Sequence, residues 1–228
     1  MIYLTSKYLV RHVNIRVTDG SRLFLLSKAN LSSAFKYYDY ICASLKMTNN
    51  MILSDKKILA AIQAGDIVIE PYDRSCLGTN SYDVHLSKHL AVYNDEVLDA
   101  KKHNTIREIV MPEEGYVLEP GVLYLGVTEE YTETHNSVPF LEGKSSVGRL
   151  GIDIHATAGK GDVGFCNTWT LEISCTQPVR VYPGMPIGQL IYFMVDGDIE
   201  NYYNKKANAK YTTRTTKPVE SMMWKNKF

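Results

Sequence analysis

The stretch WTLEISC, residues 169–175, decides the fold class of this chain. Its residues alternate without a break between apolar (Trp169, Leu171, Ile173, Cys175) and polar (Thr170, Glu172, Ser174). A period of two puts successive side chains on opposite faces of a β-strand. The stretch therefore predicts a strand with one buried face.

Further short runs rich in Val, Ile, Tyr and Thr follow Gly65, and turn signals such as Pro183-Gly184 separate them. This spacing predicts an all-β barrel or sandwich. LGIDIHAT, residues 150–157, predicts another strand, whose apolar face holds Leu150, Ile152 and Ile154.

A short helix is expected ahead of these strands, in MILSDKKILAAIQAG, residues 51–65. Ser54 can cap its start, and Gly65 can end it. Ile58, Leu59 and Ile62 recur at the spacing that places side chains on one helix face.

Composition divides the chain into three parts. Residues 1–50 are predicted to lie outside the core domain, which spans residues 51–200, and residues 201–228 form a polar arm rich in Lys and Thr. The first part is basic, with only Asp19 and Asp39 as acids up to Lys46. Such a bias is typical of a transit peptide. We favour translated upstream sequence, with the functional start at Met47 or Met51.

The overall charge balance argues against several classes of protein. The 25 basic and 25 acidic residues cancel, whereas a nucleic-acid-binding protein usually has a basic excess. No apolar run is long enough to cross a membrane. The four cysteines lack CxxC spacing and indicate reduced core thiols in a cytoplasmic protein.

Two familiar nucleotide chemistries are excluded by spacing. The Gly143-Lys144 pair suggests a P-loop, but Val138 stands where that motif needs its first glycine. A zinc deaminase needs H-x-E and P-C-x-x-C, and neither occurs. We therefore predict no zinc and no metal ligands in the protein itself.

GKSSVGR, residues 143–149, still collects groups that suit a polyphosphate. Lys144 supplies a mobile charge and Arg149 a rigid fork, with two hydroxyls between them. The alternative is a surface turn that happens to be basic. Similarly, Glu172 can be a solvated side chain or a general acid/base, and Asp162 can be a turn residue or a carboxylate that binds a sugar hydroxyl.

These motifs occur together and in order: LEGKSSVGRLG, HATAGKGDVGF, WTLEI and YPGMPIGQLIYF. With MILSDKKI, TNSYDVHLS and the C-terminal arm, they resemble the dCTP deaminase family of the dUTPase-like superfamily over residues 51–221. The resemblance implies a distorted β-barrel or jelly roll with a short N-terminal helix. It also implies homotrimers with active sites between subunits.

The implied activity is zinc-independent hydrolysis of dCTP to dUTP and ammonia, with Mg²⁺ accompanying the triphosphate. Glu172 matches the general acid/base. Ser145, Arg149 and the backbone carbonyl of Ala158 match the groups that hold the attacking water. The candidate partners are dCTP, dUTP and the inhibitor dTTP, without nucleic acid or membrane.

The remaining roles concern nucleotide binding and are also implied by the resemblance. Lys144 and Ser146 match phosphate contacts within the nucleotide-binding turn, which includes Val147 and Gly148. Asp162 matches the contact to the deoxyribose 3′-hydroxyl, and Thr170 and Leu171 match the backbone edge that reads the pyrimidine. Contacts to the triphosphate or base are expected from Gln189, Tyr203, Lys210 and Arg214.

Two departures from the commoner family pattern stand out. Lys144 replaces an arginine, and Arg214 replaces a glutamine in the arm, next to Thr212 and Thr213. Four activities remain as hypotheses, and we prefer the first, with the second as the main alternative. The first is a deaminase that releases dUTP, and the second a bifunctional enzyme that continues to dUMP and pyrophosphate. The others are a plain dUTPase, with Asp162 as base, and a silent nucleotide-binding regulator.

Overall fold

The computed structural model describes residues 15–18, 22–25 and 52–228. The chain separates into two compact units, residues 1–49 and 50–228. In the first unit, β1 (Ile15–Thr18) pairs antiparallel with β2 (Arg22–Leu25). The proposed starts at Met47 and Met51, and Cys42, lie outside the described residues.

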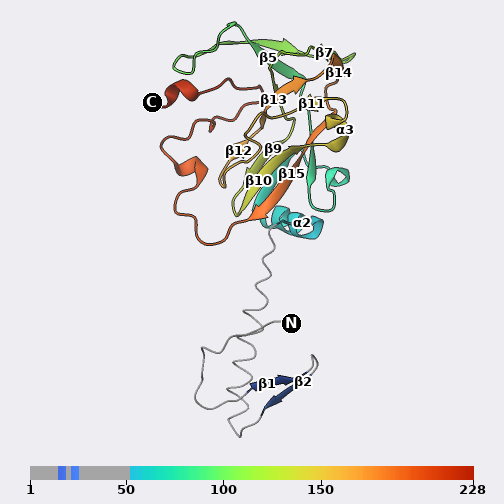
Figure 1. Ribbon diagram of the computed structural model, residues 1–228, viewed down its shortest axis with the longest axis vertical. Coiled ribbons are helices and arrows are strands. Elements are labelled where there is room, and N and C mark those ends of the chain that lie inside the picture. Colours follow the sequence, from blue (N-terminus) through green and yellow to red (C-terminus); the bar gives the residue numbers. More distant parts are fainter. Residues whose placement is uncertain (1–14, 19–21, 26–51) are drawn as a thin grey trace. The chain divides into compact units, whose positions relative to one another are not determined.

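The second unit is built mainly of short antiparallel strands (Figure 1). They are β3 (Ile67–Glu70), β4 (Tyr82–His85), β5 (His89–Tyr93), β6 (Ile106–Val110), β7 (Tyr116–Leu118), β8 (Tyr124–Val127), β9 (Tyr131–Thr134), β10 (Ser137–Gly143), β11 (Ile152–Asp153), β12 (Cys166–Asn167), β13 (Thr170–Cys175), β14 (Val179–Val181) and β15 (Pro186–Met194). The helices are α2 (Asp55–Ala64) and α3 (Ser145–Gly148), with 3₁₀ turns η1 (Arg74–Cys76), η2 (Tyr203–Lys205) and η3 (Met223–Lys225).

The strands form several small sheets around one core. A five-stranded sheet has the order β11-β13-β8-β5-β6, and two three-stranded sheets have the orders β10-β15-β4 and β12-β9-β3. A further pair joins β14 to β7. This arrangement confirms the all-β prediction.

The strand predicted from WTLEISC is β13, and its alternation is confirmed. Leu171 and Ile173 are buried in the core at 1% and 0% exposure, whereas Thr170 and Glu172 are half-buried. β13 pairs with β8 on one side and with β11 on the other. The alternation thus fixes which face of β13 carries Glu172.

The strand predicted from LGIDIHAT is shorter than expected. Only Ile152–Asp153 pair in a sheet, and Leu150 is 46% exposed, so its predicted place on the apolar face is wrong. The cause is the turn that ends α3, in which the Leu150 N–H donates to Val147 O at 3.0 Å. Gly151 follows with a φ of 77°, which L side chains rarely adopt.

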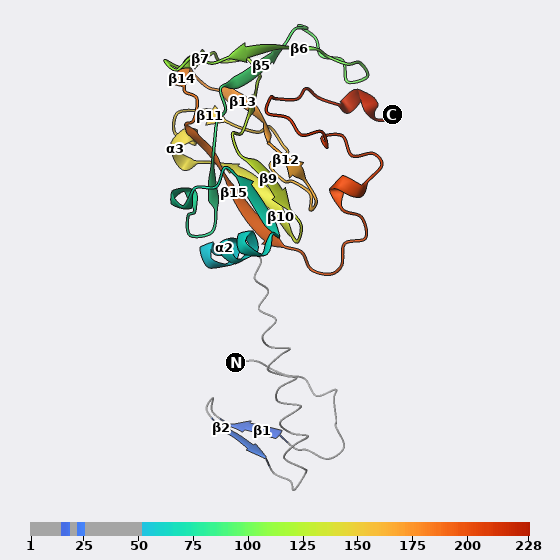
Figure 2. The ribbon, with the colours of Figure 1, turned by 180° about the vertical axis from the view of Figure 1, so that it is seen from behind.

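Helix α2 begins and ends where the sequence predicts. Ser54 is its N-cap residue, although its side chain makes no capping hydrogen bond, and Gly65 ends the helix in the left-handed conformation. Ile58 is fully buried, and Leu59 and Ile62 pack against the core. The helix covers one end of the β-structure (Figures 1 and 2).

The C-terminal segment, residues 201–228, has little regular structure. It runs along one side of the barrel, past β12 and β13, whereas α3 lies on the opposite side in both views (Figures 1 and 2). Among the described residues, no helix has the length and apolar character needed to cross a membrane.

Candidate functional site

The GKSSVGR segment forms a tight, exposed turn at the end of β10. Lys144 is the N-cap residue of α3, and its carbonyl accepts hydrogen bonds from the Val147 and Gly148 N–H groups at 2.9 Å. Val147 is buried and anchors the turn, whereas Ser145, Ser146 and Arg149 are exposed. Two hydroxyls and a guanidinium are therefore presented to solvent on a fixed backbone.

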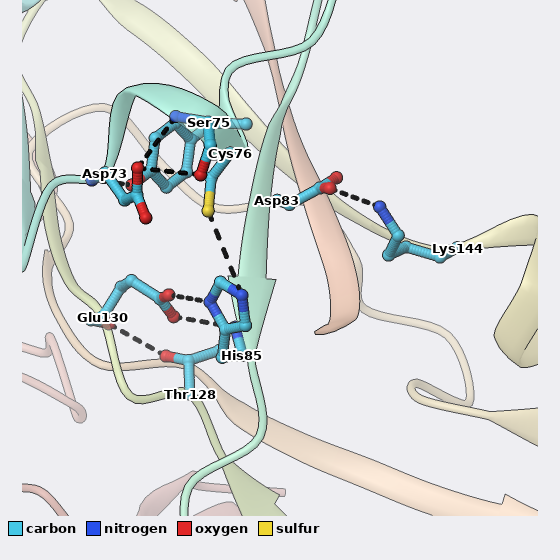
Figure 3. A network of polar contacts seen from close by, with 9 residues as sticks. Asp73, Ser75, Cys76, Asp83, His85, Thr128, Glu130 and Lys144 are labelled. Carbon is cyan, nitrogen blue, oxygen red and sulfur yellow. Dashed lines mark hydrogen bonds and ion pairs between the residues drawn. The ribbon is translucent and has the colours of Figure 1, made fainter. Parts of the chain in front are cut away.

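Lys144 reaches back across the sheet that contains β10, where it forms an ion pair with Asp83 of β4 (Figure 3). Asp83 lies opposite Gln189 of β15, and Gln189 lies opposite Glu142 of β10. The Ser81 hydroxyl donates to the Gln189 side chain at 3.2 Å. Lys144, an expected phosphate contact, and Gln189, an expected contact to the triphosphate or base, therefore belong to one polar row across three strands.

Glu172 is held by the segment that follows β11. Its Oε2 accepts a hydrogen bond from the Ala156 N–H at 3.1 Å, and its own N–H donates to Ile154 O at 2.9 Å. Ala158, two residues further, is exposed. The structure thus brings the predicted acid/base and the loop of Ala158 together.

Asp162 lies in a turn between two lysines. Its carboxylate oxygens are 2.7 Å from Lys160 Nζ and 3.8 Å from Lys206 Nζ. The hydrogen bond from Lys160 is the main cause that lowers the pKa of Asp162 below its ordinary value, against the effect of partial burial. Asp162 is therefore a carboxylate at neutral pH.

Tyr203 packs on the same turn from the arm. Its N–H donates to Val163 O at 2.9 Å, its ring lies 5.9 Å from the Phe165 ring, and its hydroxyl accepts from the Tyr211 N–H at 3.1 Å. η2 is thereby fixed beside Asp162.

The other predicted arm residues point elsewhere within the chain. Lys210 donates to Asn226, and Arg214 lies 3.9 Å over the Tyr131 ring and 3.3 Å from Glu70. None of these partners belongs to the predicted site. The roles of Lys210 and Arg214 stay predictions.

Thr170 and Leu171 begin β13. The Leu171 side chain is buried and its backbone pairs with Gly126 of β8, whereas the Thr170 hydroxyl accepts a hydrogen bond from the Val219 N–H at 3.1 Å. This contact places the arm at the start of β13, where the pyrimidine is expected.

Asn167 is a residue that the sequence does not single out, yet it fixes the arm. Its buried side chain donates to Tyr211 O at 3.3 Å and Thr213 O at 2.8 Å, and accepts from the Thr215 N–H at 3.1 Å. The Thr168 hydroxyl adds a hydrogen bond to Thr215 O at 2.7 Å. No periodicity marks such an asparagine, because its partners lie more than forty residues away along the chain.

The predicted residues therefore form two groups. One comprises α3 and the polar row of Lys144 and Gln189, and the other comprises Glu172, Ala158, Asp162, Thr170 and Tyr203. In the described part of the chain, no hydrogen bond or ion pair joins α3 side chains to Glu172. α3 and the arm lie on opposite sides of the barrel (Figures 1 and 2), whereas the loop of Ala158 lies beside β10, where the Leu141 N–H donates to Gly159 O at 2.7 Å.

A family model and the curated relatives that match this chain point to the same family. A model described as dCTP deaminase-like matches residues 52–195. A protein of Cytophaga hutchinsonii named "dCTP deaminase, dUMP-forming" is 56% identical over 156 residues, which cover 68% of this chain and 90% of that protein. Proteins with the same name from Leptospira biflexa and Clostridium acetobutylicum are 54% identical, covering 70% and 68% of this chain and 91% and 90% of theirs.

A solved structure supports the fold. The 2′-deoxycytidine 5′-triphosphate deaminase of Agrobacterium tumefaciens superposes with a TM-score of 0.52 at 23% identity. The match covers 64% of this chain and 48% of that one, so this chain spans about half the length of the solved protein. Together with the family model, this likeness confirms the predicted barrel.

Proposed function

The chain belongs to the dCTP deaminase-like family, and from this premise we propose that it converts dCTP to dUMP in two hydrolytic steps. The first step replaces the cytosine amino group by oxygen, releasing ammonia. The second cleaves the triphosphate, releasing pyrophosphate. The observation that carries the proposal is the 54–56% identity to three relatives named as dUMP-forming.

This proposal departs from the sequence-based preference for dUTP as the product. Glu172 and GKSSVGR favour a deaminase over a plain dUTPase, but they do not distinguish dUTP from dUMP as the final product. The names of the relatives favour the bifunctional alternative.

Deamination is assigned to Glu172. The Ala156 N–H fixes Oε2, which leaves Oε1 to take a proton from the water that attacks C4 of cytosine. The same carboxyl group then returns the proton to the departing amine. Ser145, Arg149 and the Ala158 carbonyl would hold the water and stabilise the charge that develops on it.

Nucleotide binding is assigned to both groups of residues. Asp162, kept ionised by Lys160, would accept a hydrogen bond from the 3′-hydroxyl, and Lys144, Ser146 and Gln189 would contact phosphate oxygens. No cluster of three metal-ligating side chains occurs among the described residues. We propose that Mg²⁺ arrives bound to the triphosphate as part of the substrate.

We further propose that each active site lies between two copies of the chain. The proposal is supported by the placement of α3 and the arm on opposite sides of one barrel, which would let α3 of one copy and the arm of the next contact the same nucleotide (Figures 1 and 2). A closed ring of three copies would supply equivalent sites.

Product analysis tests the function. The full-length protein is incubated with dCTP and Mg²⁺, and dUTP, dUMP, pyrophosphate and ammonia are quantified with time. Equimolar ammonia, dUMP and pyrophosphate, without accumulation of dUTP, is the expected result. Accumulation of dUTP would refute the second step. Hydrolysis of dUTP with dCTP untouched would show a plain dUTPase, and binding without turnover would show a silent regulator.

A further inference from the structure

A cysteine, a histidine and a glutamate form a relay outside the proposed nucleotide site. Cys76 ends η1, and its Sγ lies 4.0 Å from Nε2 of His85 on β4. Nδ1 of His85 lies 2.5 Å from Oε1 of Glu130. Figure 3 shows the imidazole ring between the sulfur and the carboxylate.

Glu130 is held in a fixed position, so it determines which nitrogen of a neutral His85 ring carries the proton. The residue is 3% exposed, and its second oxygen accepts the His85 backbone N–H at 2.9 Å. A carboxylate only accepts hydrogen bonds, so in a neutral imidazole the proton stays on Nδ1. Nε2 then faces the sulfur as a base.

The thiol itself is at rest in its protonated form. Burial, followed by the nearby Asp73 carboxylate, raises the pKa of Cys76 above its ordinary value. A preformed thiolate is therefore disfavoured, and reaction at neutral pH requires a base that removes the proton during attack. His85 is placed to do this, as in other nucleophile–base–carboxylate arrangements.

We propose that Cys76 is a covalent modification site for small uncharged electrophiles, with His85 as its general base and Glu130 as the residue that orients His85. The sulfur forms a bond to the electrophilic carbon, the leaving group departs with its bonding electrons, and the thiol proton moves to Nε2. Glu130 stabilises the resulting imidazolium. The preference for uncharged reagents follows from the carboxylates of Asp73 and Glu130 near the sulfur, since the charge of Asp83 is paired with Lys144.

The chain contains its own reference thiol. Cys166 is also half-buried, and burial raises its pKa too, but its Sγ faces the Gly164 carbonyl at 3.5 Å and has no imidazole partner in the described structure. Cys175 is 7% exposed, so it is protected from reagents in the folded protein. Comparing Cys76 with Cys166 therefore isolates the contribution of His85.

Labelling kinetics test the proposal. The full-length protein is treated with limiting iodoacetamide between pH 6 and 9, and alkylation of the Cys76 and Cys166 peptides is followed by mass spectrometry, with each rate divided by that of the unfolded chain. At pH 7 Cys76 is expected to react about tenfold or more faster than Cys166. The advantage should shrink towards pH 9, and with the anionic reagent iodoacetate.

Variants separate the relay from simple exposure. His85→Gln should reduce the Cys76 rate to the level of Cys166, and Glu130→Gln should reduce it partly. His103→Gln, which alters another His–Glu pair away from Cys76, should leave it unchanged. Equal normalised rates for the two cysteines in the wild-type protein would overturn the proposal without any variant. So would an unchanged Cys76 rate in a folded His85→Gln protein.

Discussion

At the scale of single residues, Glu172 carries the proposed chemistry, and its surroundings permit a clean test. Glu172→Gln keeps an oxygen to accept the Ala156 N–H, so the side chain should stay in place while its basicity is lost. We expect ammonia release to fall at least about 100-fold, with dCTP affinity retained. Ammonia assays and calorimetric titration measure the two effects.

The matched control for that variant is Glu114→Gln, because Glu114 is an exposed glutamate far from β13 in the chain. It should keep full activity. A Glu172→Gln protein that releases ammonia at the wild-type rate would show that another group takes the proton.

The burial of Tyr82 makes the stability of the folded protein depend on pH. It is 1% exposed, its hydroxyl accepts the Asp73 N–H at 2.8 Å, and burial raises its pKa to about 12. The folded state thus favours the neutral phenol. The burial of the neutral phenol therefore contributes fully to the free energy of unfolding below pH 10, the ordinary pKa of tyrosine. This stabilisation is lost as the pH rises from 10 to about 12.

Tyr82→Phe provides the comparison, because it removes the ionisation but keeps the ring. Relative to this variant, the wild-type free energy of unfolding should fall by roughly 3 kcal/mol between pH 10 and 12. Denaturant unfolding curves at several pH values measure the difference. A constant difference over that interval would contradict the burial of an un-ionised phenol.

At the scale of elements, the arm depends on Asn167 and Thr168 rather than on regular structure. Asn167→Asp keeps the acceptor for the Thr215 N–H but loses both donors to the arm carbonyls. We expect trypsin to cleave within residues 205–217 several-fold faster in this variant. The Michaelis constant for dCTP should rise while the core melting temperature stays close to that of the wild type.

Asn208→Asp is the control, since it adds the same charge to an exposed arm position. Equal proteolysis of the two variants would show that charge, not the lost donors, loosens the arm.

Local sequence predicts the elements better than it predicts their contacts. The alternation of residues 169–175 and the Gly65 stop depend on the period of a strand and on glycine's conformational freedom, and both are confirmed. Leu150 departs from its predicted place because a one-turn helix interrupts the alternation. Neither Asn167 nor the Asp83–Lys144 pair follows from local sequence, because 61 residues separate the members of that pair and their meeting depends on the sheets.

At the scale of the whole molecule, the opposite placement of α3 and the arm predicts complementation between copies. Arg149→Ala and Glu172→Gln should each be inactive alone. When the two variants are mixed and refolded together, random association should restore on the order of a quarter of the sites, if Arg149 and Glu172 come from different copies. Deaminase activity of the mixture measures the recovery.

Refolding each variant separately and then combining them is the control, which should stay inactive while subunits do not exchange. If co-refolding restores nothing although wild-type protein refolds with activity, both residues must serve a site within one copy.

The way the arm is held also bears on how its sequence can evolve. Asn167 and Thr168 hold the peptide groups of Tyr211, Thr213 and Thr215, not their side chains. Every residue has a carbonyl group, and every residue except proline has an N–H, so side chains along this stretch can drift while docking persists. Side chains of the arm, Arg214 among them, can therefore change without rebuilding the barrel beneath it.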